Sequence, residues 1–281
     1  SRAEMTGVIG GVDGNPDEGA HGDLQRSGRD LELELRRIEA GTLGLIRDVS
    51  AQRELERHRR ETQRMVSHEL KTPLSSISGF GAMIERYELA RDEQLRVAGR
   101  IRGEADRLGE MVATFLDLER LGAGRWQAER LEVDLGALAK DRCRFLDPTV
   151  TEAGKELEIS AADGCNVLGS AELLTRLIDN LVGNAIKYSS PGDAILVTVA
   201  PSAHGVGLEV RDHGPGIQAD ALPQLFERFY RVPGTKAQGT GLGLALVKEV
   251  ADWHNASIEV DTQVACQPSN GWESRSGGKG P

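Results

Sequence analysis

Apolar and polar residues alternate strictly in the segment 29–38, where the run LELELR places leucine at every second position. A period of two predicts a half-buried β-strand. A glycine at position 41 then interrupts the chain, and residues 42–49 predict a second strand. Because an isolated hairpin is only marginally stable, we expect this one to end a truncated domain or to pack against another part. Residues 1–27 are rich in Gly, Asp and Ser and predict a loop or a disordered leader.

The spacing of apolar residues becomes helical after residue 51, where charged helix-forming residues begin. One apolar stripe, with steps of three and four residues, contains Val66, Leu70, Leu74, Ile77, Phe80 and Ile84. A second helix, beginning near residue 92, has a strict heptad stripe of Ala98, Ile101, Ala105, Leu108, Val112 and Phe115. A heptad stripe is typical of a coiled-coil or bundle seam. Two long helices with a short link bury both stripes best by pairing with a second copy, so we predict a dimeric four-helix bundle.

Strands and helices alternate in the rest of the chain. Strand patterns occur at residues 131–134, 156–160, 194–200 and 206–211, and helical patterns at residues 135–146, 170–188 and 242–253. Some strands follow one another without a helix between them, which favours an α+β arrangement with helices on one face of a sheet. The predicted fold class is therefore multidomain, with an all-α helical hairpin followed by an α+β sandwich.

Composition narrows the functions that this chain can have. Its 281 residues suit about two domains. It has 34 Lys and Arg against 44 Asp and Glu, a net charge of −10 and no basic block, which argues against nucleic-acid binding. No run of 18 apolar residues occurs, so the sequence predicts no membrane span.

The cysteines and the first residue bear on location. Cys143, Cys165 and Cys266 fit neither a disulfide framework nor a zinc spacing, which favours a reducing compartment and a cytoplasmic location. The chain starts at Ser1 without a signal-peptide pattern. We therefore expect a fragment or a processed chain, and membrane attachment through an upstream part stays open.

The segment SHELKTPL on the first helix is the first candidate for chemistry. His68 should face solvent, because it lies about 200° around the helix from its neighbours in the apolar stripe. Thr72 shares its face, Glu69 is adjacent, and Pro73 should bend the helix one turn later. An exposed neutral imidazole is a nucleophile toward phosphorus, and a neighbouring carboxylate can take its proton. The alternative is an ordinary surface histidine near a proline.

A second candidate is the helical segment DNLVGNAIKY. Asn180, Asn184 and Lys187 lie within about 60° of one another on the helix. Two carboxamides and an ammonium on one stripe suit a metal–phosphate complex, because the amide oxygen is a hard ligand for Mg²⁺. The alternative is an ordinary solvated face.

Two glycine-rich segments are further candidates. In DHGPGI, Asp212 at a strand end could accept from an exocyclic amine, while Gly214 and Gly216 let the backbone approach a flat ligand closely. A simple Asp-Gly turn explains this segment too.

The segment GTGLGL leads into a helix and contains Gly239, Gly241 and Gly243. Unhindered N–H groups at a helix N-terminus bind phosphates, although the spacing is not that of the dinucleotide fingerprint. Just before it, LFERFYR pairs aromatic residues with arginine and would anchor a lid from which Arg231 reaches phosphate.

Together these motifs, in this order and spacing over residues 50–261, resemble those of the sensor histidine kinases of bacterial two-component systems. SHELKTPL resembles the family's H box, DNLVGNAIKYS its N box, DHGPGI and GTGLGL its glycine boxes, and LFERFYR its F box. The resemblance implies that the helical bundle dimerises and accepts a phosphoryl group. It also implies that the α+β part has the ATP-binding fold of gyrase-type ATPases.

The resemblance also implies roles for single residues. His68 would be phosphorylated, Glu69 would be its acid/base neighbour, and Thr72 would place water for dephosphorylation of the partner. Asn184 would bind Mg²⁺ and Asn180 would support that site. The nucleotide would further be contacted by Lys187 and Arg231 at the phosphates, Tyr188 at its border, Asp212 at the adenine amino group, the turn glycines Gly214 and Gly216, and Gly239, Gly241 and Gly243 around the phosphates.

The implied domains have the following bounds. Residues 1–50 are the leader and a truncated hairpin, 51–124 the dimerisation and phosphoacceptor domain, 125–261 the ATP-binding domain, and 262–281 an atypical tail. GTLGLIRDVSAQRELE resembles the last strand and exit linker of a PAS domain. Ser170-Ala171 stands where the family has Asp-Pro, and the serine should cap the helix equally well. The tail shows no alternation, so we expect the sheet to lack its last strand and to have an open edge.

The function implied is an ATP-dependent histidine kinase that autophosphorylates on His68 and phosphorylates an aspartate of a response regulator. The implied cofactors are ATP and Mg²⁺, and the implied partners are a second copy and a receiver domain. One alternative is a catalytically impaired dimeric scaffold or response-regulator phosphatase. Another is a gyrase-like ATPase that only hydrolyses ATP, although SHELKTPL argues against it.

Overall fold

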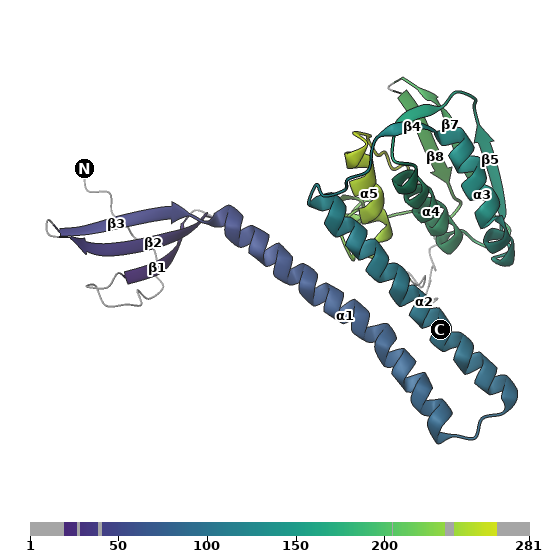
Figure 1. The fold of residues 1–281 in the computed structure, drawn as a ribbon, viewed down its shortest axis with the longest axis horizontal. Helices are drawn as coiled ribbons and strands as arrows, with labels where there is room; N and C mark the ends of the chain where they lie inside the picture. The colour runs from purple at the N-terminus through teal and green to yellow at the C-terminus, as the bar shows by residue number, and fades with distance from the viewer. Residues whose placement is uncertain (1–19, 27–28, 39–40, 204, 234–238, 263–281) are drawn as a thin grey trace, which may run out of the picture. The chain divides into compact units, whose positions relative to one another are not determined.

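A computed structural model describes residues 20–26, 29–38, 41–203, 205–233 and 239–262 of the chain (Figure 1). The chain divides into two compact units, residues 1–75 and 76–281, and each is described by itself. No helix in the described ranges is long and apolar enough to cross a membrane.

The N-terminal unit contains an antiparallel sheet rather than a hairpin. Its strands are β1 (Ala20–Arg26), β2 (Arg29–Ile38) and β3 (Gly41–Asp48), with β2 in the centre. The prediction of a loop or disordered leader is wrong for residues 20–26, which pair with β2 over their whole length. The third strand supplies what the predicted hairpin lacked, because three strands stabilise one another better than two.

Ser50 joins the sheet to the first helix. Its hydroxyl accepts a hydrogen bond from the Asp30 N–H at 2.8 Å, and its own N–H donates to Oδ1 of Asp48 at 3.0 Å. Hydrogen bonds from the side chain and backbone of Ser50 hold the pKa of Asp48 below its ordinary value. The chain thus passes from β3 into helix through a polar junction.

The two predicted long helices are present as α1 (Ser50–Arg86) and α2 (Arg91–Gly122). Pro73 lies inside α1 and does not end it. In the second unit, the guanidinium of Arg100 lies 5.7 Å from the ring centroid of Phe80, which is a cation–π contact between the two helices.

Two faces of α2 differ in their surroundings. The heptad stripe that the sequence predicts as a seam is exposed or half-buried in the single chain, and Val112 is 41% exposed. A different face, containing Met111, Leu118 and Leu121, is buried at 3%, 0% and 6% exposure. The buried face packs against helix α5 (Gly243–Trp253), a contact that the sequence did not predict.

The rest of the second unit is the predicted α+β domain. Its further elements are β4 (Leu131–Asp134), α3 (Leu135–Glu152), β5 (Glu156–Ala161), β6 (Asn166–Gly169), α4 (Ala171–Tyr188), β7 (Ala194–Ser202), β8 (Gly205–Arg211) and a 3₁₀ turn, Leu222–Gln224. Strands β5, β7 and β8 form one sheet, in which β5 is parallel and β8 antiparallel to β7, and β4 pairs with β6. Helices α3 and α4 pack on the three-stranded sheet, and α5 lies beside α4 (Figure 1).

The core lies between these helices and the sheet. Ile178 and Val182 of α4 and Val197 and Val199 of β7 are at most 1% exposed and belong to one cluster. Buried residues alternate along β7, so one face of the predicted apolar strand packs against the helices. This packing fixes which face of α4 points away from the sheet.

Three local details differ from the predictions or extend them. The strand at 166–169 was not predicted, and α3 continues through Pro148 to Glu152 rather than ending near residue 146. Ser170 caps α4 as expected, since its hydroxyl accepts from the Leu173 N–H at 3.4 Å.

The C-terminal edge of the sheet is open within the described residues. No strand follows α5 up to residue 262, and β8 pairs only with β7 in that part of the chain. The Ile217 N–H donates to the hydroxyl of Thr262 at 2.8 Å. Most of the predicted tail, residues 263–281, lies outside the described residues, and the missing strand stays a prediction.

Candidate phosphoacceptor and nucleotide sites

His68 lies on α1 with its side chain in solvent. The imidazole is 79% exposed, as predicted from its offset from the apolar stripe. Its Nδ1 lies 3.4 Å from Oε1 of Glu69, whose side chain is 29% exposed. A carboxylate at Nδ1 favours the tautomer with a proton on that nitrogen, which frees the lone pair of Nε2.

Thr72 and Pro73 follow His68 on the C-terminal side along α1. The Thr72 hydroxyl donates to the His68 carbonyl at 3.3 Å, which places Thr72 one turn from the imidazole. Pro73 has no N–H, so the carbonyl of Glu69 lacks its helical hydrogen bond. The structure therefore brings together His68, Glu69 and Thr72 on one exposed part of α1.

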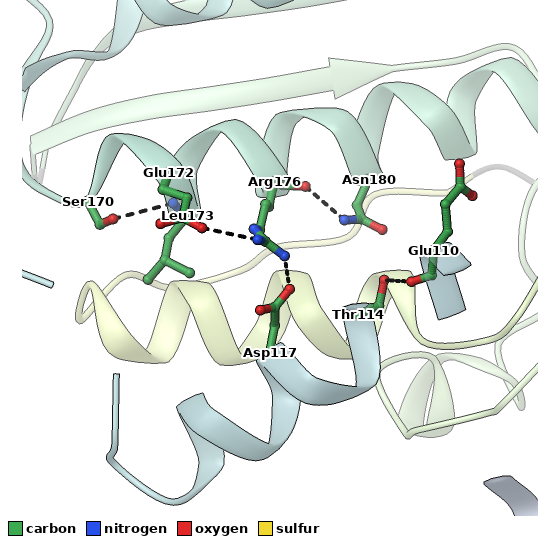
Figure 2. A network of polar contacts seen from close by, with 8 residues as sticks. All are labelled: Glu110, Thr114, Asp117, Ser170, Glu172, Leu173, Arg176 and Asn180. Atoms are coloured by element: carbon green, nitrogen blue, oxygen red, sulfur yellow. Dashed lines mark hydrogen bonds and ion pairs between the residues drawn. The ribbon is translucent and has the colours of Figure 1, made fainter. Parts of the chain in front are cut away.

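Helix α4 presents the second group of predicted residues. Asn180, Asn184 and Tyr188 are half-buried and Lys187 is exposed. The Asn180 carboxamide N–H donates to the Arg176 carbonyl at 2.8 Å, which fixes the side chain (Figure 2). The helix face that the spacing predicts is therefore present on α4, and this hydrogen bond holds the Asn180 side chain in place.

The glycine loop approaches this face so closely that no side chain fits between them. A Cβ placed on Gly243 would lie 2.5 Å from Oδ1 of Asn180. On the other side, a Cβ on Gly214 would lie 3.0 Å from the Tyr188 carbonyl oxygen. These contacts show that both glycine segments border α4, although they are far from it in the sequence.

The aromatic–arginine segment meets the glycine loop through the backbone. The Phe229 N–H donates to the Gly241 carbonyl at 2.8 Å, and both residues have left-handed backbones, with φ of 64° and 69°. A Cβ on Gly241 would lie 2.6 Å from the carbonyl carbon of Phe229. A left-handed backbone is costly for phenylalanine, so this junction is held by its surroundings. Arg231, two residues later, is exposed.

Asp212 forms a turn at the end of β8. Its Oδ1 accepts from the Gly214 N–H at 2.8 Å, and Gly216 has a φ of 75°. The side chain is exposed, and its second carboxylate oxygen, Oδ2, can accept a hydrogen bond from a donor on a ligand. This geometry suits the predicted contact with an exocyclic amine.

The side-chain oxygens at this site suit a Mg²⁺ ion that is also bound by phosphate oxygens, rather than an ion that is held by several carboxylates. Among the described residues there is no group of three or more His, Cys, Asp and Glu side chains that could hold a metal. Mg²⁺ commonly takes one or two protein oxygens together with phosphate oxygens and water. The amide oxygen of Asn184 on α4 can supply such a ligand.

Sequence reasoning missed the surroundings of Arg176, one turn before Asn180. Its guanidinium pairs with Asp117 of α2 and with Glu172 of α4, and its carbonyl fixes Asn180 (Figure 2). A signal was available, because Met111, Leu118 and Leu121 form a second short stripe on α2.

Two family models match the chain. Residues 44–124 match the His Kinase A (phospho-acceptor) domain, and residues 169–279 match the histidine kinase-, DNA gyrase B-, and HSP90-like ATPase. Together they cover more than half of the chain.

Curated relatives are sensor proteins. The chain is 34% identical over 226 residues to the phosphate regulon sensor protein PhoR of Pseudomonas aeruginosa, covering 78% of this chain and 51% of that protein. It is 33% identical over 221 residues to the sensor-like histidine kinase SenX3 of Mycolicibacterium smegmatis, covering 78% and 58%. The chain thus spans about half the length of the curated relatives it matches.

Solved structures of histidine kinases share the fold. Full-length ShkA in complex with AMPPNP aligns with a TM-score of 0.50 and 28% identity, covering 68% of this chain and 40% of that one. The histidine kinase ThkA, in complex with the response regulator protein TrrA, aligns with a TM-score of 0.56 and 19% identity, covering 83% and 71%. The chain belongs to the sensor histidine kinase family.

Proposed function

We propose that this chain is an ATP-dependent protein histidine kinase that autophosphorylates on His68 and then phosphorylates an aspartate of a response regulator. The main supporting observation is the close border between α4 and the two glycine segments, at Asn180–Gly243 and Tyr188–Gly214. It places both glycine segments against the face of α4 that carries the two asparagines, and the nucleotide cradle would lie at this border. The exposed His68–Glu69 pair supplies the acceptor.

Each residue of the cradle would contact a different part of the nucleotide. Asp212 would accept from the adenine amino group, with Gly214 and Gly216 allowing close approach and Tyr188 bordering the base. Lys187 and Arg231 would contact phosphate oxygens, because ammonium and guanidinium groups form strong charge-assisted hydrogen bonds there. Unhindered backbone around Gly239, Gly241 and Gly243, at the N-terminus of α5, would bind phosphates too.

Asn184 would be the protein ligand for Mg²⁺, and Asn180 would support the same site. The bound ion supplies neutralisation of phosphate charge, which is a large part of catalysis in phosphoryl transfer. Asn180 is held by its hydrogen bond to the Arg176 carbonyl, so its oxygen has a fixed direction. The protein's contribution is positioning.

His68 would act as the nucleophile. The lone pair of its Nε2 forms the N–P bond while the bond from the γ-phosphorus to the bridging oxygen breaks, leaving ADP. Glu69, which faces Nδ1 at 3.4 Å, is placed to take the proton from that nitrogen. Transfer of the phosphoryl group to an aspartate carboxylate of a receiver domain then regenerates the free imidazole. In the separate dephosphorylation of that partner, Thr72 would orient the water that hydrolyses the phosphoaspartate to aspartate and inorganic phosphate.

A second copy of the chain would complete the helical domain. The predicted heptad stripe of α2 stays exposed or half-buried, so it is open to a partner while the opposite face packs on α5. An apolar seam of this spacing is typical of a bundle between chains. We place the protein in a reducing compartment such as the cytoplasm, because Cys143 and Cys165 are both free thiols.

Incubation with γ-labelled ATP and Mg²⁺ tests this function. We expect acid-labile, base-stable label on the wild-type protein and none on His68→Ala, which should still bind ATP. Asn184→Ala should lose both the label and the Mg²⁺-dependent part of ATP affinity. Label on His68→Ala would show another acceptor. ATP binding without label on any variant would favour a scaffold, and phosphate release without label would favour a plain ATPase.

A further inference from the structure

The turn between α3 and β5 is bound to the loop that follows α4. Gly154, with a φ of 69°, lies in this turn, and Lys155 follows it. The Gly192 N–H, in the loop after α4, donates to the Gly154 carbonyl at 2.7 Å. The Glu156 N–H, at the start of β5, donates to the Asp193 carbonyl at 3.2 Å. Two backbone hydrogen bonds therefore join the α3–β5 turn to the connection between α4 and β7.

Lys155 also contacts α4 itself. The residue is only 9% exposed, and its Nζ donates to the Ile186 carbonyl. In a longer helix that carbonyl would accept from the N–H four residues later. Here the helix ends at Tyr188, and the Ser190 N–H donates to Oδ2 of Asp193 at 2.9 Å instead. Lys155 therefore caps a carbonyl in the last turn of α4, where the helix dipole also favours a positive charge.

The end of α4 in turn supports the DHGPGI turn, which carries Asp212. A Cβ on Gly214 would lie 3.0 Å from the Tyr188 carbonyl oxygen, so the backbone of this turn lies directly against the end of α4. The Gly214 N–H donates to Oδ1 of Asp212 at 2.8 Å, which ties the carboxylate to the same contact. Nδ1 of His213 lies 3.1 Å from the Ala194 carbonyl oxygen at the start of β7. The DHGPGI turn is thus held from two sides, by α4 and by β7.

Both of these supports are bound to the α3–β5 turn. Tyr188 lies two residues after the carbonyl that Lys155 caps. Ala194 directly follows Asp193, whose carbonyl is bound to β5. The backbone hydrogen bonds of this turn need no particular side chain, whereas the bond to α4 depends on the ammonium of Lys155. A single buried side chain therefore links the α3–β5 turn to the part of α4 on which the DHGPGI turn lies.

We propose that Lys155 is a positioning residue for the adenine end of the nucleotide site. By capping the last turn of α4, it holds the DHGPGI turn where Asp212 can accept from the adenine amino group. The inference rests on the proposed function, which assigns that contact to Asp212. Without the ammonium the Ile186 carbonyl loses its partner, and the last turn of α4 unwinds toward another donor. The DHGPGI turn then loses its support on that side.

Hydrogen–deuterium exchange without nucleotide tests the support of this turn. Lys155→Met keeps the apolar stem but removes the donor, and should speed exchange of peptides covering 186–194 and 212–217 about tenfold. Ser170→Ala is the matched control, because it removes a cap at the other end of α4 and should leave exchange of these peptides unchanged. Lys155→Gln, a shorter side chain that still has a donor, should act in the same direction as Lys155→Met. It takes the place of the methionine variant if that variant does not fold.

Binding of ATP and of purine riboside triphosphate, which lacks the 6-amino group, then tests the positioning role. Wild type and Ser170→Ala should each bind ATP about tenfold more tightly than the analogue, because the amino group donates to a charged carboxylate. In Lys155→Met this preference should fall below about threefold, while affinity for the analogue stays close to that of wild type. A general loss of stability would not change the ratio of the two affinities.

Each outcome decides a separate point. Unchanged exchange in the Lys155 variants, or an equal change in Ser170→Ala, overturns the inference. Faster exchange with an undiminished preference for ATP overturns the positioning role. A wild type that does not prefer ATP overturns it too, and also refutes the contact assigned to Asp212. Label on His68 decides the kinase reaction independently, so a preference lost in Lys155→Met without label in wild type would support the role of Lys155 and refute the kinase.

Discussion

Replacing Gly243 with alanine should weaken nucleotide binding far more than it weakens the fold. The added Cβ would lie 2.5 Å from Oδ1 of Asn180, a separation at which something must move. The carboxamide is the group that can rotate, since the three atoms nearest to the added Cβ all belong to the Asn180 side chain. The rotation breaks its hydrogen bond to the Arg176 carbonyl, now 2.8 Å long.

The contributions of this substitution to the free energy of unfolding partly cancel. Its effect on nucleotide binding is not opposed by any favourable contribution. Loss of the hydrogen bond costs about 1 kcal/mol, and a displaced rotamer costs about as much again. Replacing glycine by alanine recovers roughly 0.5–1 kcal/mol by restricting the unfolded chain. The net loss of stability is therefore about 1 kcal/mol, or roughly 2–4 °C in Tm. Displacement of the Asn180 carboxamide, which supports the proposed Mg²⁺ site, has no such compensation and should reduce nucleotide affinity about tenfold or more.

Titration with a fluorescent ATP analogue in the presence of Mg²⁺, together with thermal melting, separates the two effects. Gly183→Ala is the control, because it lies on the same helix with no atom within 4 Å of the new Cβ. It should raise stability by about 0.5–1 kcal/mol and leave nucleotide affinity unchanged. Equal nucleotide affinity of Gly243→Ala and wild type would refute the reasoning, as would a similar loss of affinity in Gly183→Ala.

Three further predictions concern the stability of the ATP-binding domain. Burial, with a smaller contribution from the charge of Arg130, lowers the pKa of His254 below its ordinary 6.5, although a hydrogen bond to a backbone carbonyl opposes this. The unfolded chain therefore takes up the proton first, and Tm should fall as pH drops below about 6.5; His254→Gln should flatten that part of the Tm–pH curve, and an unchanged curve would contradict the assignment. Ser170→Ala should lower the free energy of unfolding in urea by about 1 kcal/mol, because the cap on α4 is lost. An unchanged free energy of unfolding would show that the cap does not contribute to stability. Arg142→Gln should cost about 1 kcal/mol, because a two-bonded, half-buried ion pair to Asp179 is lost; a loss above about 3 kcal/mol would indicate an unpaired buried charge instead.

Hydrophobic periodicity predicted the elements whose packing repeats along the chain. The spacing of apolar residues predicts the long helices α1 and α2 and the amphipathic α4, and a run of apolar residues predicts the strand β7. The strands β1 and β6 were missed because β1 is polar, with the sequence AHGDLQR, and β6 has only four residues. Both strands are stabilised by pairing, β1 with β2 and β6 with β4. The local sequence of a strand does not show which other strand it will pair with.

In the candidate site, too, relations within one helix could be predicted from spacing, whereas contacts between elements could not. Residues that share a helix face, such as Asn180 and Asn184, could be grouped from spacing because the helix period fixes their relative directions. The contact between Asn180 and Gly243 could not, since it depends on how α4 and α5 pack. The pair Asp117–Arg176 was missed for the same reason, because a charged residue on a helix is usually solvated.

Direct identification of the phosphorylated residue tests the central claim most sharply. Wild-type protein incubated with ATP and Mg²⁺ would be digested at neutral to alkaline pH, and its peptides fragmented by electron transfer in a mass spectrometer. We expect a single phosphorylated residue, His68, within the peptide that contains SHELKTPL. Phosphorylation of any other residue, with His68 unmodified, would contradict it.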